Sequence, residues 1–172
     1  MSERWRVSST MPELGARVRD ARGRAQSLSR ALAAPAEALR ALVARGFRTA
    51  TAPDGSRWAA LADSTVERRR EGRGPGPRAV PLVDTGILRN AAVGGVRVRG
   101  NAILLTVQVP YAAVHQQGTK RAGRKRNVAI PRRAYLPLTP DLRLMATGPA
   151  GQWRKRLKRD VAAYVARAGR RG

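Results

Sequence analysis

The residues best suited to chemistry gather around one histidine. His115 is the only histidine of the chain and lies in the stretch VPYAAVHQQGT, followed by two glutamines and a glycine. An imidazole titrates near neutral pH and can act as a general base, a proton shuttle or a metal ligand. A Ser-His-Asp arrangement would need Ser56 or Ser64 as nucleophile and Asp54 or Asp84 as the acid. No nucleophile-elbow motif surrounds either serine, so the sequence does not support such a triad.

The rest of the inventory argues against catalysis. Cysteine is absent, which excludes disulfides, thiolate metal sites and a cysteine nucleophile. One histidine and scattered acids are too few to build a metal site. Glu67 and Glu71 lie four residues apart inside an arginine run and suit surface ion pairs. No phosphate-binding G-x-x-x-x-G-K-[ST] loop is present. We therefore expect no enzyme activity, no metal and no cofactor.

If His115 takes no part in catalysis, two interpretations of its role remain open. Its imidazole is either half-buried and hydrogen-bonded to backbone, or a contact at a subunit interface. Tyr111, Val114, His115 and Gly118 are spaced i, i+3, i+4 and i+7, which predicts one or two helical turns stopped by the glycine.

The charge of the chain is strongly positive. Lys and Arg number 35 against 11 acids, for a net charge of +24, so a negative partner surface is expected. Seven basic residues lie between Lys120 and Arg133 without one acid, and eight lie between Arg154 and Arg171 with only Asp160 opposing. Stacking aromatics are missing, so contact with nucleic acid would be with phosphates and independent of sequence. The candidate contacts with DNA or a neighbouring acidic protein are Lys120, Arg121, Arg124, Lys125, Arg126, Arg154, Lys155, Lys158 and Arg159.

Length and composition predict one domain over residues 1–172. Aromatic residues make up only 4% of the chain, so the core must use mainly Ala, Val and Leu, and we expect neighbouring subunits to complete it. No apolar run approaches the roughly 18 residues of a membrane-spanning helix, so no membrane partner is expected.

The first half of the chain predicts a long amphipathic helix and an exposed loop. Apolar or small residues recur every three or four positions from Leu14, which is typical of one helix face. Pro35 is expected to kink or restart this helix, and Gly46 is expected to cap its end. Pro, Asp and Gly of TAPDGS have turn chemistry. Residues from about 68 to 80, with the run RRREGRGPGPR, predict an exposed loop.

The second half predicts short helices and extended segments. Asp84 or Thr85 is expected to cap a short helix that buries Ile87 and Leu88. Residues 118–129 predict an exposed basic loop, VAIPRRAYLPL an extended segment, and residues 152–168 a basic C-terminal helix.

The clearest local pattern is a hairpin in GGVRVRGNAILLTVQV. A two-residue turn at Gly100 and Asn101 sets Val98 opposite Ile103, and the alternation of apolar residues closes without a slip. The apolar row is expected to continue through Val109. The predicted class is α+β: a small antiparallel sheet with the long N-terminal helix and the C-terminal helix packed on it.

The order of several short motifs carries more information than any one of them. The order is F…PDGSRWAAL, an arginine-rich spacer, LVDTGILRNAA, a hairpin, YAAVHQQGT, a basic loop and IPRRAYLPL. This series resembles the phage virion morphogenesis family, the tail completion proteins of Mu-like phages and prophages, over about residues 47–138. The residues that carry the resemblance are Phe47, Pro53, Asp54, Gly55, Trp58, Asp84, Thr85, Gly86, Leu88, Tyr111, Ala112, His115, Gly118, Pro131, Tyr135 and Leu136.

The resemblance implies a structural protein of the virion. It implies a ring, six-fold by expectation, at the head-proximal end of the tail, where the chain would act in tail completion, as a tail terminator or in head-tail joining at the neck. The implied partners are copies of the chain, tail tube and head-tail connector proteins, and DNA in the channel. The alternative is a sequence-nonspecific nucleic-acid-binding protein of nucleoid or ribosome type.

Overall fold

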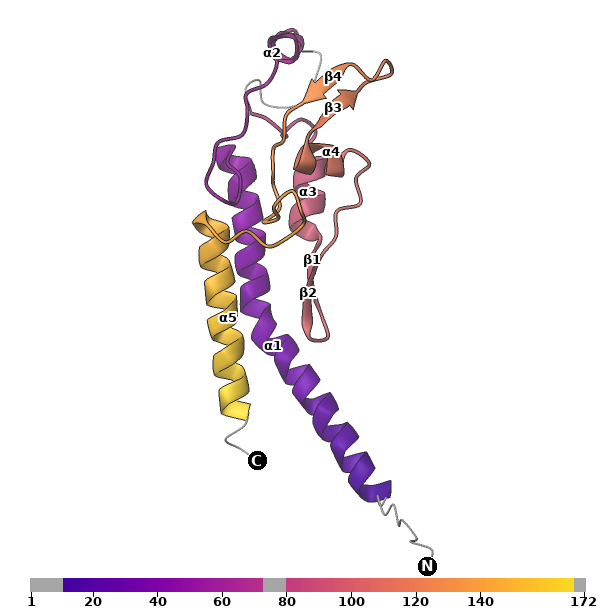
Figure 1. The fold of residues 1–172 in the computed structure, drawn as a ribbon, viewed down its shortest axis with the longest axis vertical. Helices are drawn as coiled ribbons and strands as arrows, with labels where there is room; N and C mark the ends of the chain where they lie inside the picture. The colour runs from indigo at the N-terminus through magenta and orange to yellow at the C-terminus, as the bar shows by residue number, and fades with distance from the viewer. Residues whose placement is uncertain (1–10, 73–79, 169–172) are drawn as a thin grey trace, which may run out of the picture.

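The computed structural model describes residues 11–72 and 80–168, apart from the side chains of residues 11–22, 24–27 and 168. Two helices form its long axis: α1 (Met11–Thr49) and α5 (Gly148–Ala168), which lie side by side over part of α1 (Figure 1). The remaining elements lie toward one end of this pair. They are α2 (Asp63–Arg70), α3 (Ile87–Gly94), β1 (Val96–Arg99), β2 (Ala102–Leu105), α4 (Ala112–Gln117), β3 (Thr119–Ala122) and β4 (Val128–Ile130).

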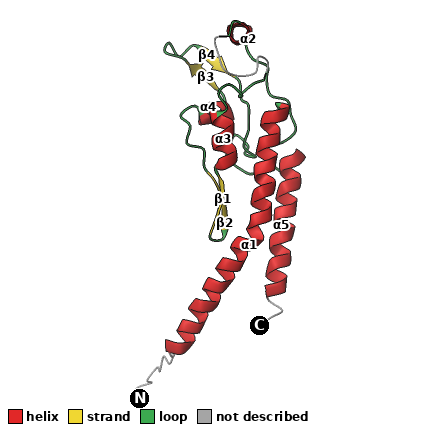
Figure 2. Cartoon of the chain, turned by 180° about the vertical axis from the view of Figure 1, so that it is seen from behind, coloured by secondary structure: helices red, strands yellow, loops and turns green. Residues whose placement is uncertain are grey.

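The predicted α+β class is confirmed. The four short strands form two separate antiparallel hairpins, β1–β2 and β3–β4 (Figure 2). The β1–β2 hairpin and α3 lie against α1, opposite its contact with α5. The beginning of α1 extends past all of these elements (Figure 1).

The helix α1 has the predicted apolar stripe. Leu32, Leu39, Val43 and Phe47 are buried at helical spacing. Pro35 lies inside the helix, which continues through it, and the helix axis changes direction along its length (Figure 1). A proline that removes one backbone donor from a helix favours such a bend. The predicted kink is therefore found without a restart.

The predicted cap at Gly46 is wrong, because α1 continues to Thr49. Gly46 is buried, and a Cβ atom at this position would lie 2.8 Å from the carbonyl oxygen of Thr51. The chain reverses at Ala50, whose φ is 52°. Glycine is thus required here by the close return of the backbone and not by the end of the helix.

The C-terminal helix begins four residues before its predicted start. Gly148 has a φ of 58° and packs so tightly on the turn at Asp54 that a Cβ atom would meet the carbonyl oxygen of Asp54 at 2.0 Å. The N–H of Ala150 also donates to the carbonyl of Pro53 at 2.8 Å. This tertiary contact places the first turn of α5. Further along, the apolar stripe becomes gradually more exposed: Trp153 is buried, Leu157 is partly buried, and Val165 is 60% exposed.

The β1–β2 register is the one that the sequence predicts. Val96 pairs with Leu105 and Val98 with Ile103, with Gly100 in the turn at a φ of 57°. Val96 is fully buried, which fixes which face of the hairpin is turned inward. The apolar row continues as predicted, since Val107 and Val109 pack against the core, but the strand itself ends at Leu105 and not at Pro110.

The prediction for the short helix is only partly correct. The helix α3 starts after Gly86, whose φ of 80° forms the cap, and no side chain caps it. Thr85 Oγ1 accepts a long hydrogen bond of 3.4 Å from the N–H of Ile87. Leu88 is buried as predicted, but Ile87, the first residue of α3, is 55% exposed.

Both predicted basic loops contain regular structure. Residues 68–70 end helix α2, and Arg69 is buried there; residues 73–79 of the first loop lie outside the described residues. The second loop, residues 118–129, is mostly the β3–β4 hairpin, with an irregular register between Thr119 and Ala122. The arginine-rich composition correctly predicted that the basic side chains of this hairpin are exposed. It gave no indication that the segment forms two paired strands.

Aromatic motif residues form the centre of the core. The rings of Trp58 and Tyr135 lie 5.5 and 5.7 Å from the ring of Phe47. The indole N–H of Trp58 donates to the carbonyl of Ala134 at 2.7 Å, and the Tyr135 hydroxyl donates to the carbonyl of Ala112 at 3.2 Å. Because each polar tip has a partner, these large side chains are buried without cost to hydrogen bonding.

Candidate functional site

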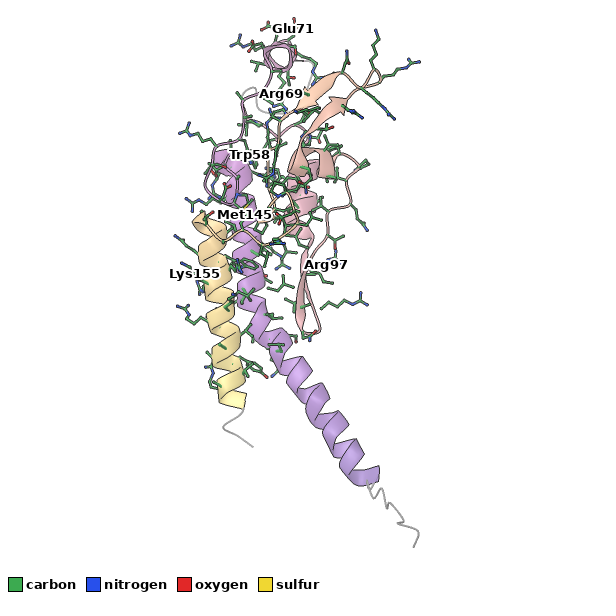
Figure 3. All side chains as sticks on the ribbon, viewed as in Figure 1. Trp58, Arg69, Glu71, Arg97, Met145 and Lys155 are labelled. Atoms are coloured by element: carbon green, nitrogen blue, oxygen red, sulfur yellow. The ribbon has the colours of Figure 1, made fainter. Side chains whose placement is uncertain are left out.

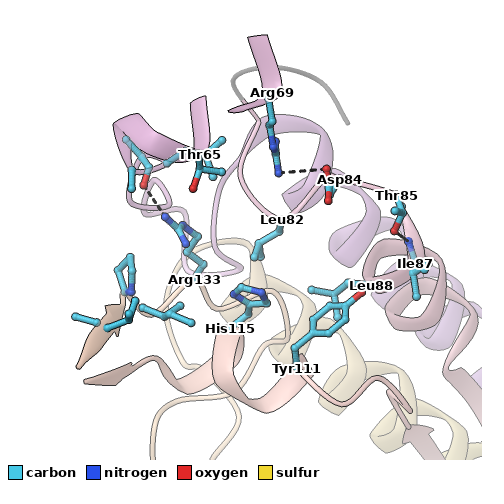
Figure 4. A pocket seen from close by; sticks show the side chains of 18 residues that line it. Thr65, Arg69, Leu82, Asp84, Thr85, Ile87, Leu88, Tyr111, His115 and Arg133 are labelled. Carbon is cyan, nitrogen blue, oxygen red and sulfur yellow. Dashed lines mark hydrogen bonds and ion pairs between the residues drawn. The ribbon is translucent and has the colours of Figure 1, made fainter. Parts of the chain in front are cut away.

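The motif segments converge on one open pocket of about 720 Å³, which we call the motif pocket (Figure 4). Four stretches line it: the chain into α2, the loop into α3, helix α4 and strand β4 with the residues after it. The lining residues are Ala60, Leu61, Ala62, Thr65, Arg69, Leu82, Asp84, Thr85, Gly86, Ile87, Leu88, Tyr111, His115, Val128, Ala129, Ile130, Pro131 and Arg133.

The structure divides the family-motif residues into three groups. Phe47, Trp58, Ala112, Tyr135 and Leu136 are buried in the core. Pro53, Asp54 and Gly55 form the turn on which α5 begins, and Gly118 ends α4. The residues that line the motif pocket are Asp84, Thr85, Gly86, Leu88, Tyr111, His115 and Pro131.

His115 lies on one wall of the motif pocket and is half-buried. Its ring packs edge-on against Tyr111, with the centroids 5.8 Å apart (Figure 4). Its carbonyl accepts the N–H of Arg133 at 2.8 Å, but its Nδ1 atom has no hydrogen-bond partner among the described residues. The predicted hydrogen bond from the imidazole is therefore absent at Nδ1. Burial, and then the nearby charge of Arg133, lower the pKa of His115, which favours the neutral imidazole.

The geometry provides no catalytic triad at His115. Asp84 faces Arg69 across 3.8 Å between carboxylate and guanidinium (Figure 4). Ser56 donates its hydroxyl to Asp54 at 2.6 Å in the turn before Trp58. Burial works to raise the pKa of Asp54, but the hydrogen bonds from Ser56 outweigh it, and the pKa is lowered. Neither Ser56 nor Ser64 lines the motif pocket.

Two buried arginines support the walls of the motif pocket. Arg133 donates to the carbonyls of Ala59 and Ala60 at 2.7 and 2.5 Å. Arg69 donates to the carbonyls of Val80 and Val83 at 3.0 and 3.3 Å. Burial lowers the pKa of Arg133. These guanidiniums fix loops that lack strand partners, a role that the sequence analysis missed because it counted them as surface charge.

Gln116 is a third buried polar residue whose role the sequence did not reveal. Its Oε1 accepts the N–H groups of Tyr135 and Leu136, each at 3.0 Å. Its Nε2 donates to the carbonyls of Leu136 and Leu138 at 3.4 and 3.2 Å. One amide thus replaces the strand partner that the segment after β4 lacks. The position beside His115 was visible in the sequence, but its burial was not.

The rim of the motif pocket exposes apolar side chains. Ile87 is 55% exposed, Val128 49% and Tyr111 42%, although the surface elsewhere is rich in charge. They come from α3, β4 and the residue before α4, which are far apart in the sequence. An apolar rim of this kind is typical of a surface that binds another protein.

The candidate basic contacts lie in two separate places. Lys120, Arg121, Arg124, Lys125 and Arg126 are exposed on the β3–β4 hairpin, at the end of the molecule opposite the start of α1 (Figure 1). The other group lies on α5, where Lys155 points away from α1 (Figure 3). In that group Arg154 is partly buried, and Lys155, Lys158 and Arg159 are exposed. The two groups do not form one basic surface.

The described residues offer neither a cluster of metal ligands nor a membrane-spanning helix. Over residues 11–72 and 80–168, no three His, Asp or Glu side chains are grouped to hold a metal ion. Within the same ranges, no helix has both the length and the hydropathy needed to cross a membrane.

A family model for phage virion morphogenesis proteins matches residues 7–153. This chain belongs to the phage virion morphogenesis family. The match contains the whole motif pocket and the β3–β4 hairpin, and it ends at Trp153. The basic residues of α5 from Arg154 onward lie beyond it. The family defines a structural role in virion morphogenesis in a bacteriophage and associates the chain with the virion.

One curated relative supports the family. The chain is 44% identical over 64 residues to the Mu-like prophage FluMu G protein 2 of Haemophilus influenzae. The alignment covers 37% of this chain and 44% of that protein, so the chain spans less than half of the length of the relative. No solved structure matches the chain.

Proposed function

We propose that this chain is a tail-completion or tail-terminator subunit that closes into a ring, with six copies, on the head-proximal end of the tail. The observation that carries this proposal is the apolar rim of the motif pocket, where three exposed apolar side chains, Ile87, Tyr111 and Val128, line the same cavity. Membership of the virion morphogenesis family supports the structural role.

A ring requires a head-to-tail interface in which two different surfaces of each copy meet. The motif pocket supplies one such surface, and the second copy is its proposed occupant. Burial of the rim on assembly removes apolar area from water and supplies the driving force for association. The thin core, with its few aromatics, fits a subunit that neighbours help to stabilise.

The two faces of the ring would bind different proteins of the virion. One face would meet the tail tube and the other the head-tail connector, so that the chain joins head to tail at the neck. A role in the neck places the protein in the finished virion, after assembly in the host cytoplasm.

The ring is tested by measuring mass in solution. Light scattering after size exclusion, with negative-stain imaging, should show a closed oligomer of the wild-type protein. Ile87→Glu combined with Val128→Glu should leave a folded monomer, because charge replaces apolar contact at the rim. Leu142→Glu is the matched control, since Leu142 is 66% exposed and lies outside the motif pocket.

Tail assembly gives the second readout. In a phage that lacks its own copy of the gene, the wild-type chain should restore joined particles, and the rim variant should leave tails without heads. A wild-type protein that stays monomeric, fails to bind tails and holds free duplex DNA tightly at about 200 mM salt would instead support the nucleic-acid-binding alternative.

A further inference from the structure

The β3–β4 hairpin concentrates positive charge that nothing in the described part of the chain neutralises. Lys120, Arg121, Arg124, Lys125 and Arg126 are all exposed. None of their side chains forms an ion pair or a hydrogen bond with another described residue. Figure 3 shows long side chains that stand out from this hairpin into open space. Five cations within seven residues repel one another, so a negative partner would stabilise the arrangement.

The basic face of α5 differs in its local balance. Asp160 lies 3.7 Å from Arg156 and 3.5 Å from Arg159, measured between carboxylate oxygens and the Nε atoms of the arginines. The helix also packs one side against α1. Its charges are therefore partly paired along a structural helix. The hairpin is the stronger candidate for a binding surface.

The composition of the hairpin tip indicates which kind of negative partner fits. Residues 123–127 read GRKRN and contain no apolar side chain. The core of a protein–protein interface is apolar and depleted in charge, whereas protein–DNA interfaces are polar and strongly positive. A two-stranded ribbon also has the width that the DNA major groove admits. No aromatic residue lies in the hairpin, so it lacks the aromatic platform on which the bases of a single strand usually stack.

The base of the hairpin is held in place by the core. Gly118, with a φ of 76°, packs its Cα against Arg132, where a Cβ atom would lie 2.8 Å from the backbone nitrogen. Three residues after the end of the other strand, Arg133 is fixed by its hydrogen bonds to residues 59 and 60. At the tip, the N–H of Arg126 donates to the carbonyl of Gly123 at 3.0 Å. A support that is already ordered reduces the entropy that binding must remove.

We propose that the β3–β4 hairpin binds duplex DNA through its phosphates, without reading the base sequence. The proposed ring supplies the place where the DNA is met, namely the channel between head and tail. The binding itself depends on the hairpin alone and does not require the ring. The two proposals therefore have separate tests.

The test compares two variants that remove the same charge from different places. One carries Arg121→Gln, Arg124→Gln, Lys125→Gln and Arg126→Gln in the hairpin. The matched control carries Arg154→Gln, Lys155→Gln, Lys158→Gln and Arg159→Gln in α5. The probe is a fluorescently labelled mixed-sequence DNA duplex, and its anisotropy gives the dissociation constant between about 50 and 200 mM salt. Thermal melting confirms that both variants are folded.

We expect the DNA affinity of the hairpin variant to become much less sensitive to salt concentration, and that of the α5 variant to keep its sensitivity. Each phosphate contact contributes about 0.9 to the slope of log K against log salt, so removal of four contacts should lower the slope by about 3.6. A duplex of different sequence should bind wild type equally well. Ile87→Glu alone, which alters the proposed ring interface outside the hairpin, should retain DNA binding per hairpin.

Three results would overturn the proposal. Equal losses in both variants would show that net charge alone attracts DNA. A wild-type protein without measurable binding at the lowest salt would exclude a DNA site. Polyglutamate that competes as well as unlabelled duplex at equal charge would show that the hairpin fits an acidic protein instead.

Discussion

The β3–β4 hairpin and the segment that follows it, residues 132–138, are neighbours in the chain and differ in environment. The arginines of the hairpin are exposed, without ion pairs to described residues. Arg133 is 6% exposed and donates to two carbonyls, and Arg132 donates to the carbonyl of Leu138 at 2.9 Å. The seven basic residues of this one run therefore lie in two environments. Five are exposed, and two donate to backbone carbonyls.

This difference teaches that the charge of a residue does not decide its role. The buried segment has backbone groups without a strand partner, and Arg132 and Gln116 bond to them. Arg133 donates from this segment to the carbonyls of Ala59 and Ala60. The hairpin has its own strand pairing and needs no such help. Substitutions in the two regions should therefore affect stability and binding separately.

The largest expected effect is that of Tyr135→Ala in the buried segment. Tyr135 is 2% exposed, contacts Phe47 and donates to the carbonyl of Ala112, so its loss leaves a cavity and an unpaired acceptor. Chemical denaturation should show a decrease of about 3–5 kcal/mol in the free energy of unfolding. Tyr111→Ala, at a 42% exposed tyrosine, is the control and should cost far less. Similar losses at both tyrosines would contradict the structure.

The sharpest comparison is Arg133→Ala against Arg124→Ala. Arg133→Ala removes charged hydrogen bonds to the carbonyls of Ala59 and Ala60, so the free energy of unfolding should fall by about 2–3 kcal/mol. Arg124→Ala should change it by less than about 0.5 kcal/mol, as is usual at an exposed position. Denaturant titration of both variants gives the answer. If Arg124→Ala were the more damaging, the division between supporting and exposed arginines would be wrong.

Gln116→Leu should have an intermediate effect. The change preserves bulk but leaves the N–H groups of Tyr135 and Leu136 without their acceptor, at a cost of about 1–2 kcal/mol. Hydrogen exchange should then be faster at these two amides than elsewhere in the core. Gln117→Leu provides the control, because this neighbouring glutamine is only partly buried. If exchange at both amides were the same in Gln116→Leu as in wild type, Gln116 would not be the residue that supports this segment.

The smallest expected effect is the pH dependence at His115. Because burial lowers the pKa of His115 in the folded protein below about 6.5, the unfolded state binds the proton more readily. Stability should be constant above about pH 6.5 and fall as the pH decreases toward the folded pKa. Unfolding curves of wild type and His115→Gln between these limits check this, and the variant should lose the slope. An equal slope in the variant would assign the pH dependence to another group.

The elements with strong local patterns could be predicted from the sequence. Alternation of apolar residues determined the β1–β2 register, and helical spacing determined the stripe of α1 through Phe47. The helical spacing of residues between Tyr111 and Gly118 predicted α4 and its end at the glycine. The order of short motifs identified the family that the match over residues 7–153 shows. These features depend on residues close together in the chain, whose preferences the sequence states directly.

The tertiary structure alone decided which motif residues meet and which charges are buried. The motif pocket joins residues from 60 to 133, and no local spacing records that Asp84 lies opposite Arg69 or that His115 lies beside Arg133. The role of Gly46 also depends on the return of Thr51, not on the end of a helix. The physical reason is that burial and hydrogen bonding at these sites are set by distant backbone groups, which only the folded chain brings within reach of the side chains.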